Sequence, residues 1–375
     1  MLSVDPVDVG DRRDVGRFLH LPFRLYRGHP LWVPPIMIDA AAQLSPAKHP
    51  FYEHSEAAFF LARRADEDVG RIAVLNNRPF NHYHAHQDAQ FYLFECIEDI
   101  EVAQALFERA FAWARGRGLD RMVGPKGFGA LDGYGMLIEG FEFRPAMTMM
   151  NYNPPYYPAF MEELGFQKEV DFISCYLGAN QFRLPERVHR IAERAAARSG
   201  LTVKRFESRE ELREWAGRIG RMYNQSFINN WEYYPLSDRE IAFLTDNLLT
   251  VADPRLIKLI THGDEAVGFL FAFPDVSAAI QRSRGRLFPF GIIDLLLEFK
   301  RTKWVALNGA GILPEYQGRG GNALLYSEME KTIRQARFVH ADLTQVAETA
   351  VQMRRDLENI GGVPYKNHRV FSRPM

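Results

Sequence analysis

The spacing of apolar and polar residues along the chain predicts alternating strands and helices. Short apolar runs broken by polar turns are typical of paired strands, and apolar residues three or four apart are typical of amphipathic helices. In the first half, Ala57 to Arg63 and Val69 to Asn76 flank a polar turn and predict a hairpin. A third strand is expected at Gln90 to Glu98, followed by an amphipathic helix at Glu101 to Arg117.

The second half predicts the same order of elements. Leu256 to Thr261 and Ala266 to Phe273 form a second hairpin around a polar turn, and Trp304 to Ile312 is the next strand. A helix at Leu324 to Arg334 and a strand at Phe338 to Leu343 follow. An order that recurs after half a chain indicates a tandem duplication.

The predicted fold class is therefore α/β (α+β), with two similar domains at 1–180 and 181–375. Each domain is expected to hold a mixed, largely antiparallel twisted sheet flanked by helices. Two serines support the helix assignments in the second half, because Ser208 and Ser237 each precede a glutamate by three residues, which is typical of a capping box.

Composition and charge exclude several classes of protein. The chain has 375 residues and a formal net charge of −1, so nothing indicates a broad nucleic-acid-binding surface. The two cysteines, Cys96 and Cys175, lie in apolar runs and are expected to be buried free thiols. The acidic N-terminal segment lacks the apolar core of a signal peptide, and no run is long enough to span a bilayer, so we expect a cytoplasmic protein.

Three histidines, His82, His84 and His86, alternate along a segment that would present them on one face if it were extended. Such a face could bind a metal. We favour the simpler interpretation of a polar loop, because no further ligand-type residue is fixed beside them, and we predict no metal site.

The glycine-rich stretch after Trp304 to Ile312 carries the strongest chemical signal. Residues 317–323 read Gln-Gly-Arg-Gly-Gly-Asn-Ala and connect a predicted strand to a predicted helix. Glycines expose the backbone, and a helix N-terminus offers free amides and a positive dipole. The stretch therefore predicts an anion site of pyrophosphate size.

This stretch resembles the motif of the GNAT superfamily of acyl-CoA N-acyltransferases, which is (Gln/Arg)-x-x-Gly-x-(Gly/Ala) between a strand and a helix. Gln317 and Gly320 match the motif, and Asn322 stands where glycine or alanine is usual; we expect asparagine to tolerate the backbone angles of the turn. The resemblance covers about residues 200–375, and the first half looks like a degenerate copy. It implies acetyl-CoA or another acyl-CoA as co-substrate. The implied cofactor-binding residues are Gly311, Ile312, Leu313, Gln317, Gly318, Arg319, Gly320, Gly321, Asn322 and Ala323.

A looser resemblance covers the whole chain. The segments 32–35 (Trp-Val-Pro-Pro), 70–72 (Gly-Arg-Ile), 153–157 (Asn-Pro-Pro-Tyr-Tyr) and 230–231 (Asn-Trp) are similar to a group of bacterial two-domain GNAT-like proteins. Some members of that group are ceramide synthases, which acylate a long-chain base. The resemblance implies an amine acceptor, which the sequence leaves open as a small molecule, a lipid base or a peptide.

For catalysis, the resemblance directs attention to the segment 225–235, which follows the first long helix of the second half. Glu232 and Tyr234 are the candidate catalytic residues, and Asn230, Trp231 and Asn308 the candidate acceptor-binding residues. The family often has a tyrosine as general acid four residues before the glycine that closes a later helix, but Leu357 stands there. The missing tyrosine keeps a non-catalytic CoA-binding protein or sensor open as an alternative, and a Fem-like aminoacyl transferase is the other alternative.

The segment Ile280 to Lys303 reads as an insertion between two strands of the second half. It is rich in apolar residues and could line an acyl pocket, touch a membrane surface or form a homodimer contact. We expect ordinary burial in the core.

Overall fold

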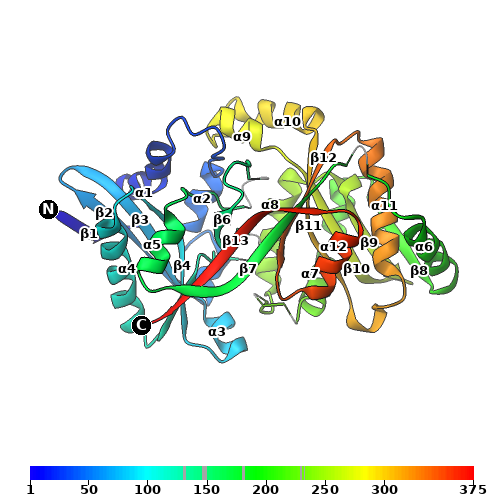
Figure 1. Ribbon diagram of the computed structural model, residues 1–375, viewed down its shortest axis with the longest axis horizontal. Helices are drawn as coiled ribbons and strands as arrows, with labels where there is room; N and C mark the ends of the chain where they lie inside the picture. The colour runs from blue at the N-terminus through cyan, green and yellow to red at the C-terminus, as the bar shows by residue number, and fades with distance from the viewer. Residues whose placement is uncertain (130–131, 146–149, 180–181, 229, 232) are drawn as a thin grey trace. The chain divides into compact units, whose positions relative to one another are not determined.

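The computed structural model describes residues 1–375 except 130–131, 146–149, 180–181, 229 and 232. The described residues divide into two compact units, whose elements are labelled in Figure 1. Unit 1 comprises residues 1–172, 276–298 and 366–375, and unit 2 comprises residues 173–275 and 299–365. The predicted boundary at 180/181 concerns the two sequence repeats and stays a prediction.

Unit 1 is built on a sheet with the strand order β1-β2-β3-β4-β5-β13, and β6 also pairs with β13. Its pairs are antiparallel except that β4 and β5 run parallel. The strands are β1 (Leu2–Pro6), β2 (Glu56–Arg64), β3 (Glu67–Asn76), β4 (Asp88–Cys96), β5 (Arg121–Gly124), β6 (Met136–Glu139), the first part of β7 (Gln167–Leu177) and the last part of β13 (Val363–Pro374). The helices are α1 (Arg12–Leu25), α2 (Met37–Gln43), α3 (Arg78–His84), α4 (Ile100–Arg115), α5 (Tyr157–Glu163), α9 (Ser277–Ser283) and the first part of α10 (Gly291–Arg301).

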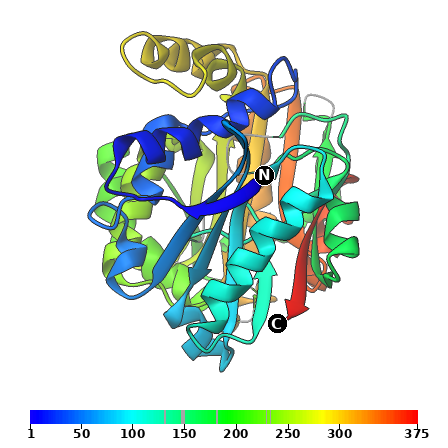
Figure 2. The ribbon, with the colours of Figure 1, turned by 90° about the vertical axis from the view of Figure 1, so that its left-hand side faces the viewer.

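Helices cover both faces of the unit 1 sheet, as Figure 2 shows. On one face α4 buries an apolar stripe that includes Val102, Leu106 and Phe107, all fully buried against β2 to β4. On the other face α1 and α2 form a second core around Phe18 and Phe128. The alternation of buried residues along β3 supplies both cores, because successive strand side chains point to opposite faces.

Unit 2 repeats this plan with the strand order β7-β12-β11-β10-β9-β8. The strands β8 to β11 pair in antiparallel fashion, and β11 runs parallel to β12. The strands are β8 (Leu201–Arg205), β9 (Ile257–His262), β10 (Glu265–Pro274), β11 (Trp304–Ile312) and β12 (His340–Ala347). The helices are α6 (Glu186–Arg198), α7 (Arg209–Ser226), α8 (Asp238–Val251), α11 (Gly321–Gln335) and α12 (Val351–Asn359).

The two units share a hairpin, a third antiparallel strand, a helix and then a parallel strand, in that order along the chain. In unit 1 these are β2, β3, β4, α4 and β5, and in unit 2 they are β9, β10, β11, α11 and β12. The predicted fold class is confirmed. Both predicted serine caps are also present, since the Ser208 hydroxyl accepts from the Glu211 amide at 3.2 Å and Ser237 with Glu240 forms a full capping box.

Two local predictions were wrong. The segment with the three histidines is not a polar loop, because His82 and His84 lie in the short helix α3 (Arg78–His84). The described residues contain no group of three His, Cys, Asp or Glu side chains that could hold a metal ion. The insertion Ile280 to Lys303 is not core: α9 and α10 leave Phe288, Phe290 and Ile293 between 55% and 77% exposed. The helix packs through other positions, as described below.

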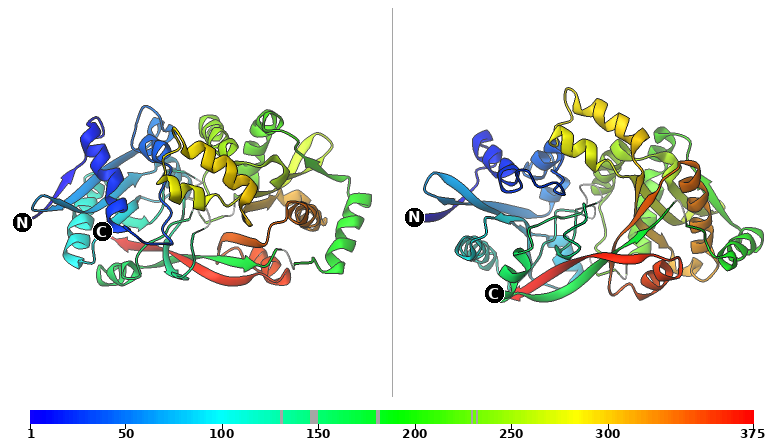
Figure 3. Two further views of the ribbon diagram at one scale, coloured as in Figure 1. Left: turned by 90° about the horizontal axis from the view of Figure 1, so that it is seen from above. Right: turned by 45° about the horizontal axis from the view of Figure 1, so that its top comes forward.

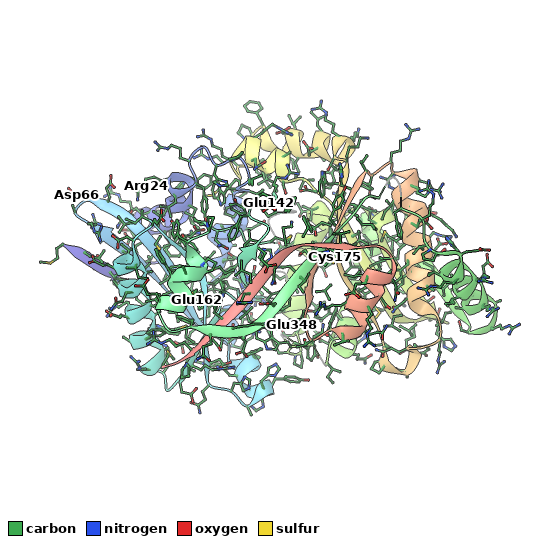
Figure 4. All side chains as sticks on the ribbon, in the orientation of Figure 1. Arg24, Asp66, Glu142, Glu162, Cys175 and Glu348 are labelled. Carbon is green, nitrogen blue, oxygen red and sulfur yellow. The ribbon has the colours of Figure 1, made fainter. Side chains whose placement is uncertain are left out.

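Both cysteines are free and buried, as predicted. Cys96 ends β4, and Cys175 lies on β7, where Figure 4 labels it. Burial raises the pKa of both thiols. Among the described residues, every helix is too short or too polar to cross a lipid bilayer.

Candidate active site

The strand β11 parts from its parallel neighbour halfway along its length. Residues Trp304 to Leu307 pair with His340 to Leu343 of β12, whereas Asn308 to Ile312 continue beside β10 without a matching register on β12. An irregularity in the β10 pairing places one extra residue on β11 near Asn308, and Gly309 has φ +103°. A bulge of this kind bends its strand, so a gap opens between β11 and β12.

Backbone amide and carbonyl groups of β11 face this gap. The Leu313 amide donates to the Val267 carbonyl of β10 at 2.9 Å, so Leu313 faces β10. Backbone groups alternate sides along a strand, which directs those of Ala310 and Ile312 away from β10. The Ile312 carbonyl accepts from the Gln317 side chain at 3.1 Å. The Ile312 amide and both backbone groups of Ala310 therefore face the gap and can pair with an extended ligand.

Glycines shape the turn that follows. Gly318 and Gly320 have φ of +74° and +85°, which side chains of L-residues rarely adopt. A Cβ on Gly320 would lie 2.9 Å from the Ala195 Cβ of α6, and a Cβ on Gly321 would lie 2.8 Å from Ile312 Cδ1. The turn thus needs glycine both for backbone angles and for close packing of α11 on the sheet.

The N-terminus of α11 lies directly after this turn. Gly320 is the N-cap and no side chain caps the helix, so the amides of the first turn remain available as donors. Arg319 adds a positive charge on an exposed position, with its guanidinium carbon 5.0 Å from the centre of the Tyr316 ring. Free amides, a helix dipole and an arginine together favour binding of a phosphate group.

Asn322 does not play the part that the sequence suggested. It lies inside α11 rather than at a left-handed turn position, and its side-chain amide donates to Asp356 of α12 at 3.2 Å. The side chain of Asn322 joins α11 to α12 and its backbone is helical, so the expectation about its backbone angles was wrong.

The segment predicted to bind the acceptor begins at the end of α7. The Ser226 Cβ lies 3.1 Å from the place a Cβ on Gly311 would occupy, so this end of α7 packs directly on β11. The Phe227 ring lies 5.5 Å from the Phe269 ring of β10. The buried Ser226 hydroxyl has no hydrogen-bond partner among the described residues, and sequence reasoning missed it because one serine at a helix end gives no periodic signal.

The other predicted acceptor and catalytic residues lie in or near this segment. Asn230 and Trp231 are half-buried, and Asn308 lies at the bulge of β11. Tyr234 is 5% exposed, and its hydroxyl donates to Glu240, the residue that completes the cap of α8. This contact gives Tyr234 a structural role. Glu232 lies outside the described residues.

A polar cluster occupies one face of β12. The Tyr365 hydroxyl donates to the fully buried carboxylate of Asp342, and burial together with that carboxylate raises the pKa of Tyr365. His340 accepts or donates at 2.8 Å with the Tyr176 hydroxyl, and burial lowers the pKa of His340. Asp342 lies one residue before the end of the β11 pairing and is thus the member of this cluster nearest the gap, whereas His340 pairs with Trp304 at the other end. Sequence reasoning missed this cluster because the apolar and polar pattern of β12 is that of an ordinary strand.

Leu357, at the position where a general-acid tyrosine was expected, belongs to the core of unit 2. Leu357 is 7% exposed and packs with Cys175 and Leu343. It therefore cannot donate a proton. Nearby, α11 and the strands enclose a largely apolar cavity in unit 2, lined among others by Leu177, Leu307, Tyr326, Met329, Ile333, Leu343 and Ile360.

The fold and the gap define a class of protein. A tandem GNAT protein from the clavulanic acid biosynthesis pathway superposes with a TM-score of 0.58 at 13% identity, covering 100% of this chain and 98% of that chain. The chain therefore has the tandem GNAT fold, and the predicted resemblance is confirmed at the level of the fold. No protein-family model matches the sequence.

Two curated proteins are similar to this chain over its whole length. Bacterial ceramide synthase of Caulobacter vibrioides (strain NA1000 / CB15N) is 29% identical over 384 residues, covering 100% of this chain and 98% of that protein. Protein YghO of Escherichia coli (strain K12) is 28% identical over 371 residues, covering 97% of this chain and 93% of that protein.

Proposed function

We propose that this protein is an acyl-CoA-dependent N-acyltransferase that acts on the amine of a long-chain base. The observation that carries the proposal is the gap beside β11, with Ile312 and Ala310 facing it and the uncapped N-terminus of α11 at its end. Full-length similarity to a ceramide synthase supports the acceptor class.

The turn and α11 would hold the acyl-CoA. The amides of Gly321 to Ala323 and the charge of Arg319 bind the pyrophosphate, while the backbone of β11 pairs with the extended arm that carries the thioester. This arrangement directs the thioester carbonyl toward the bulge at Asn308. A free strand amide near the bulge, such as that of Ala310, is a suitable donor to the oxyanion that develops on this carbonyl.

The reaction then requires one bond to form and one to break. The amine nitrogen attacks the thioester carbon, the C–N bond forms, the C–S bond breaks and CoA leaves as a thiolate. The amine must lose a proton and the thiolate must gain one. Asp342 is the titratable group of β12 near the end of the β11 pairing and is the candidate for proton transfer in place of the leucine at position 357.

Calorimetry and a thiol-release assay test the proposal. We expect CoA and a long-chain acyl-CoA to bind, and we expect thiol release with sphinganine as acceptor. Arg319→Glu should weaken CoA binding by about tenfold, since a charge-assisted phosphate contact contributes about 1.5–3 kcal/mol. Arg334→Glu, an equally exposed arginine in the last turn of α11, should leave the affinity unchanged.

The core position of Leu357 favours a second candidate, a protein that binds CoA without turnover. Tight CoA binding with no thiol release from any amine would support this candidate over the transferase. Absence of CoA binding would contradict both.

A further inference from the structure

The helix α10 presents its apolar face to solvent. Ile293, Leu296 and Leu297 follow a helical spacing of three and four residues and are 55%, 53% and 40% exposed. Phe288 and Phe290, in the turn before the helix, are 68% and 77% exposed. Exposed apolar residues that gather on one face mark an interaction site rather than ordinary surface.

The preceding helix α9 and the turn at Gly285 fix this segment to unit 1, and one residue on the other side of α10 is buried. Leu295 is 2% exposed, and the Gln281 side chain of α9 donates to the carbonyls of Pro30 at 3.0 Å and Trp32 at 2.8 Å. The Met37 amide donates to the Gly285 carbonyl at 2.9 Å. Because of these contacts, α9 and α10 form an ordered pair of helices, seen in both views of Figure 3. The exposed residues thus belong to a packed helix, with its side chains projecting from the ribbon in Figure 4.

The exposed charges around this apolar face are positive, because the two acidic residues of α10 are paired. Arg282 forms ion pairs with Asp294 at 2.9 Å and with Glu298, which are the acidic residues of α10. The acids are thereby neutralised from within the pair of helices. Exposed basic residues flank the apolar face on both ends: Arg284, Arg286, Lys300, Arg301 and Lys303.

We propose that the apolar face of α10 and the turn before it dock the protein on the surface of an anionic lipid bilayer. Phe288, Phe290 and the exposed residues of α10 would enter the boundary between headgroups and acyl chains, while the flanking lysines and arginines contact anionic headgroups. With 11 residues, α10 is too short to span a bilayer and is suited to lie in its surface. Self-association through this face is disfavoured, because a symmetric contact would bring the basic borders of two copies together.

Vesicle flotation of the full-length protein tests the proposal. We expect binding to vesicles of phosphatidylcholine with phosphatidylglycerol, weaker binding to phosphatidylcholine alone, and loss of the difference at high salt. The triple variant Phe290→Ser/Ile293→Ser/Leu296→Ser should reduce binding to both vesicles by about tenfold or more, as expected for lost apolar burial. The double variant Arg284→Glu/Arg286→Glu should remove only the preference for anionic vesicles.

A matched control variant replaces three exposed valines outside this face by serine and should bind vesicles like the wild type. Its substitutions are Val9→Ser, Val351→Ser and Val363→Ser. Thermal melting should show all variants folded, since the substituted side chains are exposed. Three outcomes would overturn the proposal. The first is wild-type protein that does not float with either vesicle, and the second is a triple variant that floats normally. The third is a wild-type dimer in sedimentation that the triple variant converts to a monomer, which would assign the face to a second copy.

Discussion

At the scale of single residues, the most unusual group in unit 1 is the buried carboxyl of Glu95. It lies opposite Arg71 across β4 and β3, with 3.7 Å between Oε1 and the guanidinium. Burial raises its pKa from 4.5 to about 7, although Arg71 and the Tyr26 hydroxyl oppose this shift. Its Oε2 atom has no hydrogen-bond partner among the described residues, which favours the protonated form.

This shift predicts how stability depends on pH. The folded-state pKa lies above the unfolded value, so the folded state binds more protons between pH 4.5 and 7. The stabilising contribution of Glu95 to the free energy of unfolding is therefore fully present below pH 4.5 and is lost as the pH rises through 7. The loss is about 3 kcal/mol at most. Urea unfolding of the wild type and of Glu95→Gln across this range should give a difference that declines with pH. A constant difference would show that Glu95 has an ordinary pKa.

The two left-handed glycines of the turn predict a graded effect. Gly318→Ala introduces backbone strain alone, because nothing lies within 4 Å of its new Cβ, and should cost about 1 kcal/mol. Gly320→Ala adds the contact at 2.9 Å with Ala195 and should cost about 2–3 kcal/mol or more. Urea unfolding measures both values. Equal losses would mean that α6 moves to accommodate the new methyl group.

The glycine turn could be predicted from the sequence, because glycine is the residue that adopts left-handed backbone angles without strain. It did not reveal Ser226 or Asp342, which become relevant only when strand register and helix packing place them at the gap. Tyr234 was predicted to be catalytic because it is an aromatic residue in the expected segment. In the structure its hydroxyl donates a hydrogen bond to Glu240, which caps α8.

At the scale of elements, β4 in unit 1 corresponds to β11 in unit 2 but its end is occupied by side chains of the same chain. The Cys96 amide donates to the Tyr157 hydroxyl at 2.7 Å, and the Cys96 carbonyl accepts from Tyr156 at 2.8 Å and from Tyr157 at 3.1 Å. The tyrosines at the start of α5 thus satisfy backbone groups that β11 leaves facing a gap. In unit 1 the position that corresponds to the gap is therefore filled by side chains of α5 and its N-cap.

Removing one hydroxyl tests this interpretation. Tyr157→Phe leaves the buried Cys96 amide without its partner and should cost about 1–3 kcal/mol of stability without changing CoA affinity. Tyr156→Phe is the matched control and should cost less, because the Cys96 carbonyl keeps its bond from Tyr157. Equal stability of the two variants in urea unfolding, or weaker CoA binding in Tyr157→Phe, would contradict the proposed role.

Most strands and long helices could be predicted because their apolar spacing is regular and local. The short helix α3 and the exposed face of α10 could not, because their patterns match more than one structure. An apolar stripe at helical spacing indicates a helix but does not state whether its apolar side meets protein or another environment.

At the scale of the whole molecule, the chain passes between the two units after residues 172, 275, 298 and 365. Unit 1 therefore contains segments from the C-terminal half, including the part of β13 that pairs with β5 and β6. Sequence repeats revealed the duplication, but they could not reveal this exchange of segments, which depends on tertiary contacts.

The exchange predicts the behaviour of a fragment. Residues 181–375 alone would lack Pro30, Trp32 and Met37, which bond to Gln281 and Gly285, and would lack β5 and β6, which pair with the end of β13. We expect this fragment to lack the sharp thermal unfolding of the full chain, as measured by circular dichroism. A sharp transition together with CoA binding would instead establish 181–375 as an independent domain.

Burial of Cys96 and Cys175 has a consequence for the product of the proposed reaction. Each turnover would release CoA as a free thiol, and thiols exchange with protein cysteines only where a thiolate is accessible. Both cysteines are buried, and burial raises the pKa of each. Neither cysteine is therefore suited to form a mixed disulfide with the CoA that the proposed reaction would release.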